Sequence, residues 1–268
     1  MTTTVTRSEP SPGVVLLTLD RPERLNAMDH ALVADLHTAL DEVKADRSAR
    51  VVVLTGAGRG FCAGLDIQSG STVPGTEGLD RVNAGLATQQ HIASLVPKLR
   101  SLRQPVIAAV NGPAAGGGFA LALASDVRLA AASARFNVAF VRLGLSGCDI
   151  GVSWLLPRLI GASAAFELLL TGRLIDAEEA LRLHIVSRVV PDGEVLDAAL
   201  EVAAEIVANS PTGVWMTKEV MWSQLEIGSL QAGIYLENRT QILCSTTGDM
   251  QEAMAAFLEK RPAQFGAS

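Results

Sequence analysis

Three consecutive glycines at residues 116–118 constrain the fold of this chain more than any other feature of its sequence. They follow an apolar run at 105–110, whose β-branched residues indicate a short buried strand, and they lead into an Ala/Leu-rich stretch at 119–124 that predicts the start of a helix. Glycines at such a junction leave backbone N–H groups uncovered beside the positive end of a helix, which is typical of an anion or oxyanion site. An isolated glycine run more often marks a tight turn that needs close packing.

A second glycine-rich segment, residues 51–66, reads VVVLTGAGRGFCAGLD and also follows an apolar strand. Together the two segments resemble the crotonase superfamily, the enoyl-CoA hydratase/isomerase family, whose signatures read roughly Thr-Gly-x-Gly-x-x-Phe-Cys-Ala-Gly-x-Asp and Asn-Gly-x-Ala-x-Gly-Gly-Gly. Shorter matches lie at residues 21–28, 156–161, 169–173 and 187–190, so that the resemblance covers nearly the whole chain. It implies an α/β protein with a β-β-α spiral core and a C-terminal helical region that assembles trimers or dimers of trimers.

Composition limits the classes of partner. The net charge of −6 argues against general nucleic-acid binding, and a ligand with a few phosphates would need a local basic cluster. Hydrophobic residues make up 49% of the chain but aromatic residues only 4%, which predicts an aliphatic core. The three cysteines are odd in number and lack metal-ligand spacing, so that we expect a reduced, cytoplasmic protein without a metal site.

The chain divides into three predicted regions. Residues 1–13 are rich in Thr, Ser and Pro without an apolar signal core and are interpreted as a disordered leader, 14–200 as the spiral core and 201–268 as a helical oligomerisation subdomain. The nearly uncharged stretch 105–124 is interrupted midway, which favours a buried strand, turn and helix over a membrane span. Residues 67–78 predict a loop over the site, and a long helix should follow it and end near Arg103. Further helices are predicted at 162–170, 176–183, 193–209, 211–226, 229–244 and 248–259.

The resemblance also implies how the site works. Two backbone N–H groups, which fall on Ala63 and Gly117, polarise the thioester carbonyl of acyl-CoA and stabilise an enolate, so that the CoA ester is the substrate and no cofactor is needed. Arg24 and Lys260 stand where relatives contact the CoA tail, the C-terminal positions together with Phe257 often from the neighbouring subunit. Other residues expected around the substrate are Ala27, Gly64, Leu65, Asp66, Ile67, Gly116, Phe140, Leu145 and Trp154.

The side chains depart from the hydratase pattern. Hydratases of the family carry two glutamates, and the matching positions here are Ala120 and Phe140, neither of which can exchange a proton. Asp149 is the replacement candidate, because relatives that move double bonds carry a working aspartate in this glycine-rich segment, although this segment is one residue longer. The alternative is that Asp149 caps the helix that starts near Val152 or Ser153.

One carboxylate suffices to move a proton between two carbons, whereas hydration must also position water, so that the sequence favours double-bond isomerisation of an enoyl- or dienoyl-CoA. Two alternatives stay open, a hydratase with atypical acid/base groups and a protein that binds acyl-CoA without turning it over. A dinucleotide enzyme is disfavoured, because the Gly-x-Gly-x-x-Ala pattern at 58–63 is not followed by a helix.

Overall fold

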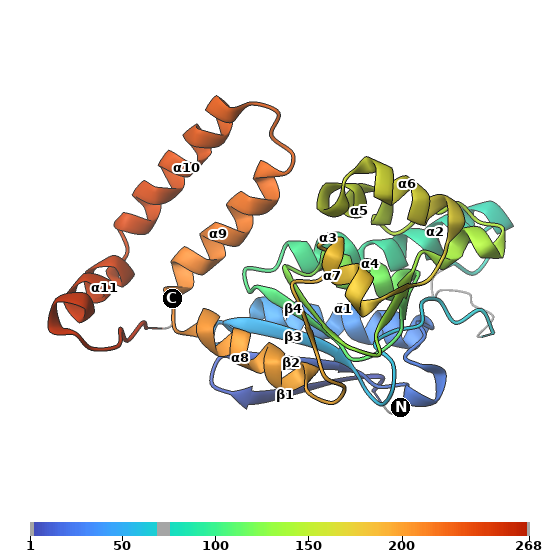
Figure 1. Ribbon diagram of the computed structural model, residues 1–268, viewed down its shortest axis with the longest axis horizontal. Coiled ribbons are helices and arrows are strands. Elements are labelled where there is room, and N and C mark those ends of the chain that lie inside the picture. Colours follow the sequence, from blue (N-terminus) through green and yellow to red (C-terminus); the bar gives the residue numbers. More distant parts are fainter. Residues whose placement is uncertain (1–2, 69–75, 267–268) are drawn as a thin grey trace.

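The computed structural model describes residues 3–68 and 76–266 and shows an α/β core from which a helical arm extends (Figure 1). The core is built on a six-stranded sheet in the order β1-β2-β3-β4-β6-β9, and a three-stranded sheet in the order β5-β7-β8 lies beside it. The strands are β1 (Val5–Ser11), β2 (Val14–Leu19), β3 (Val51–Gly56), β4 (Val106–Val110), β5 (Ala114–Ala115), β6 (Val127–Ala131), β7 (Arg135–Asn137), β8 (Ile175–Asp176) and β9 (Arg188–Val190).

The helices include two short 3₁₀ turns near the site. They are η1 (Pro22–Arg24), α1 (His30–Ala45), α2 (Arg81–Ala93), α3 (Leu95–Arg100), α4 (Gly117–Ala124), η2 (Ala139–Leu143), α5 (Val152–Ile160), α6 (Ala162–Thr171), α7 (Ala177–Arg182), α8 (Val195–Val207), α9 (Pro211–Gln224), α10 (Leu230–Ser245) and α11 (Gly248–Glu259). The predicted strands at both glycine segments and the C-terminal helices are therefore confirmed. The predicted long helix is divided into α2 and α3, because Pro97 has no N–H to continue the helical ladder.

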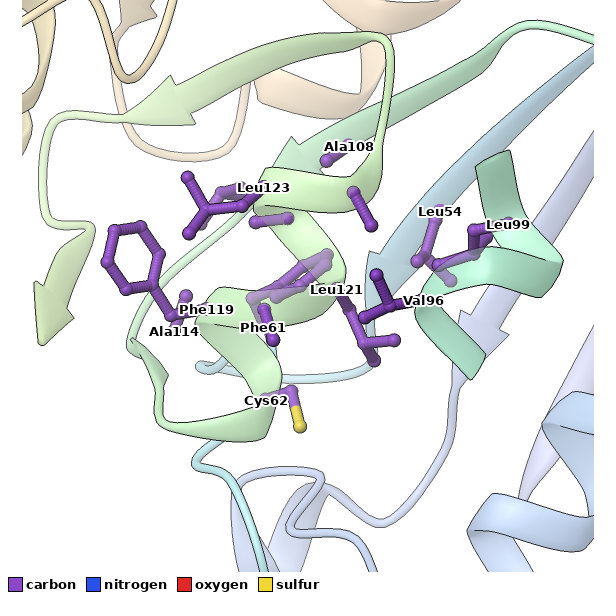
Figure 2. Packing of buried hydrophobic residues seen from close by; sticks show 14 of the residues in the cluster. Leu54, Phe61, Cys62, Val96, Leu99, Ala108, Ala114, Phe119, Leu121 and Leu123 are labelled. Carbon is purple, nitrogen blue, oxygen red and sulfur yellow. The ribbon is translucent and has the colours of Figure 1, made fainter. Parts of the chain in front are cut away.

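The large sheet is covered on both faces, which explains its apolar strands. Along β3, Val51 and Val53 point towards α8, whereas Val52 and Leu54 point towards the cluster formed with α1, α3 and α4. Figure 2 shows side chains of β3, α3 and α4 gathered in this second cluster. Every residue of α4 is buried, so that the glycine junction at its start is fixed from the inside of the protein.

The prediction of a disordered leader at 1–13 is wrong for the residues that form β1. This strand pairs antiparallel with β2, from Val5 opposite Leu19 to Ser11 opposite Val14. The Asp35 carboxylate of α1 also accepts hydrogen bonds from Thr4, including its backbone N–H at 2.7 Å. Residues 1–13 were interpreted as disordered from their composition, which gives no information on pairing with β2 or on the contact with Asp35.

The predicted boundary at residue 200 is also wrong, because it falls within α8. Ala198, Ala199 and Ala203 of that helix pack together on the large sheet. The part that leaves the core begins with α9, and we call α9–α11 the C-terminal arm (Figure 1). The arm is anchored where Lys218 Nζ lies 2.9 Å from Asp126 Oδ2 and Trp222 Nε1 donates to Asp126 Oδ1 at 2.7 Å.

The nearly uncharged stretch 105–124 forms β4, β5 and α4, as predicted. Within residues 3–68 and 76–266, no helix combines the length and apolar character needed to cross a membrane. The predicted loop at 67–78 lies partly outside the described residues, since 69–75 are not among them.

Candidate active site

The two glycine segments are in direct backbone contact. The Ala115 N–H donates to the Cys62 carbonyl oxygen at 3.0 Å, the Cys62 N–H donates to the Pro113 carbonyl oxygen at 3.1 Å, and Cys62 and Ala114 form a parallel bridge. A Cβ atom on Gly118 would collide with the Cys62 carbonyl, and one on Gly64 would lie 2.8 Å from the Ala115 carbonyl oxygen. Glycine is therefore needed at both positions for the segments to approach each other.

Two asparagines hold the loop between β3 and this contact. The Asn111 side-chain amide donates to the carbonyl oxygens of Gly56 at 2.9 Å and Gly58 at 3.0 Å. The amide of the fully buried Asn26 donates to Ala57 O at 3.0 Å and Gly60 O at 2.8 Å. Because buried carbonyls need partners, these side chains fix a glycine-rich loop that has little packing of its own.

The structure corrects the prediction for Ala63. Its N–H donates to the Leu25 carbonyl oxygen at 2.9 Å and is therefore not available to a ligand. The next peptide unit joins Gly64 to Leu65, and the positive φ of Gly64, +92°, turns it in the opposite direction. The Gly64 carbonyl oxygen accepts from the Met28 N–H at 2.7 Å. In a trans peptide the N–H points opposite to the C=O, so that the Leu65 N–H points away from Met28.

Leu65 is thus a candidate donor that the sequence pattern did not identify. Its N–H makes no hydrogen bond among residues 3–68 and 76–266, and neither does that of Gly117, the first residue of α4. A Cβ atom on Gly64 would lie 3.5 Å from Gly117 N, which places the two segments side by side. The signal that could have located Leu65 is Gly64 itself, since a left-handed glycine inverts the direction of the amides that follow it.

Apolar side chains surround Gly117. A Cβ atom there would collide with the Met28 methyl group and lie 3.3 Å from Ile150 Cδ1, while one on Gly116 would lie 3.3 Å from the Phe140 ring. Ala120, one of the two positions that the sequence analysis matched to hydratase glutamates, is fully buried one turn further along α4. Phe140 therefore lies beside the glycine junction, its predicted contact with the substrate stays a prediction, and neither position supplies an acid or a base.

Asp149 lies next to this apolar group through its neighbour Ile150. Ile150 has φ +45°, an uncommon conformation for a β-branched residue, and its Cδ1 atom lies beside Gly117 together with the Met28 side chain. The half-buried Asp149 carboxylate accepts from the Ile150 N–H at 2.7 Å and from the side-chain amide of Gln89 on α2. The alternative prediction of a capping role is wrong, because the N-cap of α5 is Gly151 and no side chain caps that helix.

The remaining residues predicted to line the pocket differ in their exposure to solvent and in their contacts. Leu145 and Ile67 are 59% and 72% exposed near the segments that carry Phe140 and Leu65. The half-buried Trp154 ring is contacted by two guanidinium groups, with Arg100 Cζ 4.5 Å and Arg158 Cζ 3.7 Å from the ring centroid, and its predicted contact with the substrate stays a prediction. The contact with Arg100 connects α5 to α3.

The basic residues fall into two groups. Arg24 is exposed and donates to Gln68 at 2.7 Å, so that it lies beside the Leu65 segment, as does the buried Ala27. Lys260 and Phe257 lie at the end of α11, on the side of the molecule away from α2 (Figure 1). The structure does not bring them to Gly117 within one chain.

Asp66, which was expected around the substrate, is held in the loop by charged neighbours. Its carboxylate lies 3.1 Å from Arg21 Nη2, which also lies 3.1 Å from Asp29 Oδ2. Desolvation raises the pKa of Asp66, but the hydrogen bonds from Arg21 and from the Gln68 N–H together lower it below its usual value.

Cys62 carries the one buried thiol among residues 3–68 and 76–266. Burial raises its pKa to about 12, against a smaller opposing effect of the Gly64 N–H. The thiol is therefore neutral near pH 7 and unsuited to act as a nucleophile.

The fold and the paired glycine segments agree with comparisons to known proteins. Residues 9–268 match the family model of enoyl-CoA hydratase/isomerase. The chain is 46% identical to "Probable enoyl-CoA hydratase echA12" of Mycobacterium bovis over 96% of this chain and 90% of that protein. It is 39% identical to the 1,2-epoxyphenylacetyl-CoA isomerase of Escherichia coli over 94% of this chain and 95% of that protein.

The structure also superimposes on the crystal structure of a probable enoyl-CoA hydratase/isomerase from Mycobacterium abscessus. The TM-score is 0.92, with 39% identity and 99% of each chain covered. The chain belongs to the enoyl-CoA hydratase/isomerase family and has the crotonase fold that its glycine segments predict.

Proposed function

We propose that the protein binds an acyl-CoA thioester with its carbonyl oxygen between the N–H groups of Leu65 and Gly117. These donors belong to rigid backbone, and they would stabilise the negative charge that develops on the oxygen when the neighbouring carbon loses a proton. The observation that carries the proposal is the juxtaposition of two amides, neither of which has an acceptor among the described residues, at the place where Gly64 approaches Gly117 N. The CoA ester is the substrate, and the proposal includes no cofactor.

The proposed reaction is double-bond isomerisation with Asp149 as the proton carrier. Its carboxylate would remove a proton from one carbon of an enoyl or dienoyl chain and return it to another, while the enolate is held by the two amides. Support comes from Ile150, whose side chain contacts Gly117 and whose N–H binds the Asp149 carboxylate. The relative named as an isomerase of a CoA ester is in keeping with this reaction.

The test compares the wild-type protein with Asp149→Asn on 2-enoyl-, 3-enoyl- and dienoyl-CoA, followed by ultraviolet absorbance. We expect the wild type to move the double bond, and the variant to lose at least a hundredfold in kcat while it still binds the thioester. Full isomerase activity in Asp149→Asn would contradict the role of Asp149.

The same assay decides between this proposal and its alternatives. Net loss of the enoyl absorbance, with formation of a 3-hydroxyacyl-CoA, would indicate a hydratase with atypical acid/base groups. Thioester binding without any turnover would indicate a protein that only holds acyl-CoA. The buried Ala120 and Phe140, which replace both glutamates, disfavour hydration.

The arm leads to a proposal about assembly. Leu230 and Phe257 are each 83% exposed, and Ile242, Leu243 and Leu258 are exposed as well. Apolar area of this kind is normally covered by another protein surface, and we expect a homotrimer or a dimer of trimers in which Phe257 and Lys260 reach a neighbouring subunit's CoA. Light scattering that gives the monomer mass would contradict this. A cytoplasmic location remains a prediction from the free cysteines.

A further inference from the structure

Gln89 on α2 connects the helix that borders the site to the candidate proton carrier. Its side-chain amide donates to Asp149 Oδ1, the same oxygen that accepts from the Ile150 N–H at 2.7 Å. Within residues 3–68 and 76–266, these are the hydrogen bonds that the carboxylate makes, and none of them involves Oδ2. One carboxylate oxygen is thus bound twice, and the other is left for a further partner.

The helix that carries Gln89 is itself fixed. His37 Nε2 of α1 donates to the His91 carbonyl oxygen at 3.0 Å, and Ile92 is buried in the core. On the neighbouring α3, the side chain of Val96 packs against Gly151, where a Cβ atom would lie 3.3 Å from Val96 Cγ1. The donor and the turn that carries Asp149 are therefore held against each other by contacts that do not depend on their own hydrogen bond.

We propose that Gln89 is a positioning residue for proton transfer by Asp149, a role that rests on the proposed function. By binding Oδ1, the amide fixes the rotation of the carboxylate and directs Oδ2 towards the substrate carbons beside Gly117. Oδ2 takes the proton from one carbon and returns it to another, so that the carboxylate ends as it began. A hydrogen bond to an ionised group is stronger than one between neutral groups, and small errors in the orientation of a catalytic group reduce the rate strongly.

The test uses Gln89→Leu, which keeps the size of the side chain but loses the donor, and Gln89→Glu, which replaces the donor by a like charge. We expect kcat for isomerisation to fall roughly tenfold or more in Gln89→Leu, and at least as far in Gln89→Glu, with KM within about twofold of the wild type. The matched control is Gln90→Leu on the same helix, because the Gln90 side chain makes no hydrogen bond among the described residues. This variant should keep wild-type kcat and KM.

Asp149→Asn is measured in parallel to separate the two proposals. If Asp149→Asn is inactive but both Gln89 variants keep the wild-type kcat, the positioning role is wrong and the proposed function stands. An increase of kcat in Gln89→Leu would also overturn the positioning role, because the hydrogen bond from Gln89 would then slow proton transfer by Asp149. A higher KM with unchanged kcat would assign Gln89 to substrate binding instead, and full activity of Asp149→Asn would overturn both proposals.

Discussion

The two sides of the candidate site are built by different means. The amide side, residues 64–66 and 116–118, consists of backbone groups from two segments whose main chains touch. The carboxylate side, residues 149–151 with Gln89, depends on two side chains, one half-buried on a turn and one exposed on α2. A backbone site resists change, because nearly every substitution adds atoms where none fit. A site made of accessible side chains can change its chemistry with single replacements.

This difference explains how one family can contain both hydratases and isomerases. Under the proposed function, the amide side would stabilise an enolate in either reaction, since both pass through charge on the thioester oxygen. The acid and base groups lie elsewhere, and here the positions on α4 and η2 are Ala120 and Phe140 while Asp149 and Gln89 face each other. The reaction should therefore be determined by the carboxylate side, and binding of the thioester by the amide side.

The strongest test of the amide side is Gly118→Ala. The added methyl group would collide with the Cys62 carbonyl, a backbone group that also accepts the Ala115 N–H, so that the two segments must separate. We expect the free energy of unfolding to fall by about 2–4 kcal/mol and the rate to fall at least a hundredfold. Chemical denaturation and the absorbance assay measure the two effects.

The matched control is Gly85→Ala, the same substitution on α2 in a position where the added Cβ meets nothing within 4 Å. Since alanine favours a helix over glycine, this variant should be more stable by about 0.5–1 kcal/mol. If the two variants behave alike, the amide side is not close-packed and the contrast between the sides fails.

Asn111→Ala should have the second largest effect, because it loosens the loop behind the amide side without adding atoms. Its amide donates to Gly56 O and Gly58 O, and its Oδ1 accepts from the Gly56 N–H at 3.2 Å. Loss of these bonds should lower the free energy of unfolding by about 2–3 kcal/mol in urea denaturation. Asn83→Ala, whose amide bonds Asp80 at the exposed start of α2, should cost less than about 0.5 kcal/mol. If Asn111→Ala lowers the free energy of unfolding by no more than Asn83→Ala does, the loop does not depend on the Asn111 side chain for its stability.

The features that the sequence predicted depend on neighbouring residues, whereas the features that it missed depend on backbone conformation or on partners far along the chain. Strands with continuous apolar residues and helices with amphipathic periodicity were predictable, as was the glycine junction at 116–118. The donor was placed on Ala63 instead of Leu65 because the direction of an amide depends on the φ of Gly64, which a motif does not state. The strand β1 and the stacking of Arg100 on Trp154 depend on partners far along the chain.

The junction of the two sides is tested by Ile150, whose side chain belongs to one side and touches the other. Alanine is normally more stable than glycine in folded backbone, but at φ +45° it keeps a strain that glycine lacks. We expect both Ile150→Ala and Ile150→Gly to lose stability from the lost buried side chain, and Ile150→Gly to be the more stable of the two by about 1 kcal/mol. The reverse order in thermal or urea unfolding would show that the turn holding Asp149 is relaxed.

The smallest effect concerns Asp66, the charged group that supports the amide side from behind. Its pKa is lowered in the folded protein, so that its stabilising contribution is present above the unfolded value near 3.9 and is lost as the pH falls through the lower, folded value. Asp66→Asn should therefore cost about 1 kcal/mol at pH 7, because the Asp66 and Arg21 side chains are only 8% and 15% exposed, and much less near pH 3. The measurement is the free energy of unfolding in urea at both pH values, with Asp20→Asn as the control for a lost surface charge. If Asp66→Asn lowers the free energy of unfolding equally at pH 7 and at pH 3, the negative charge of Asp66 does not stabilise the protein. The amide side would then be stabilised by its glycines and asparagines without a contribution from this ion pair.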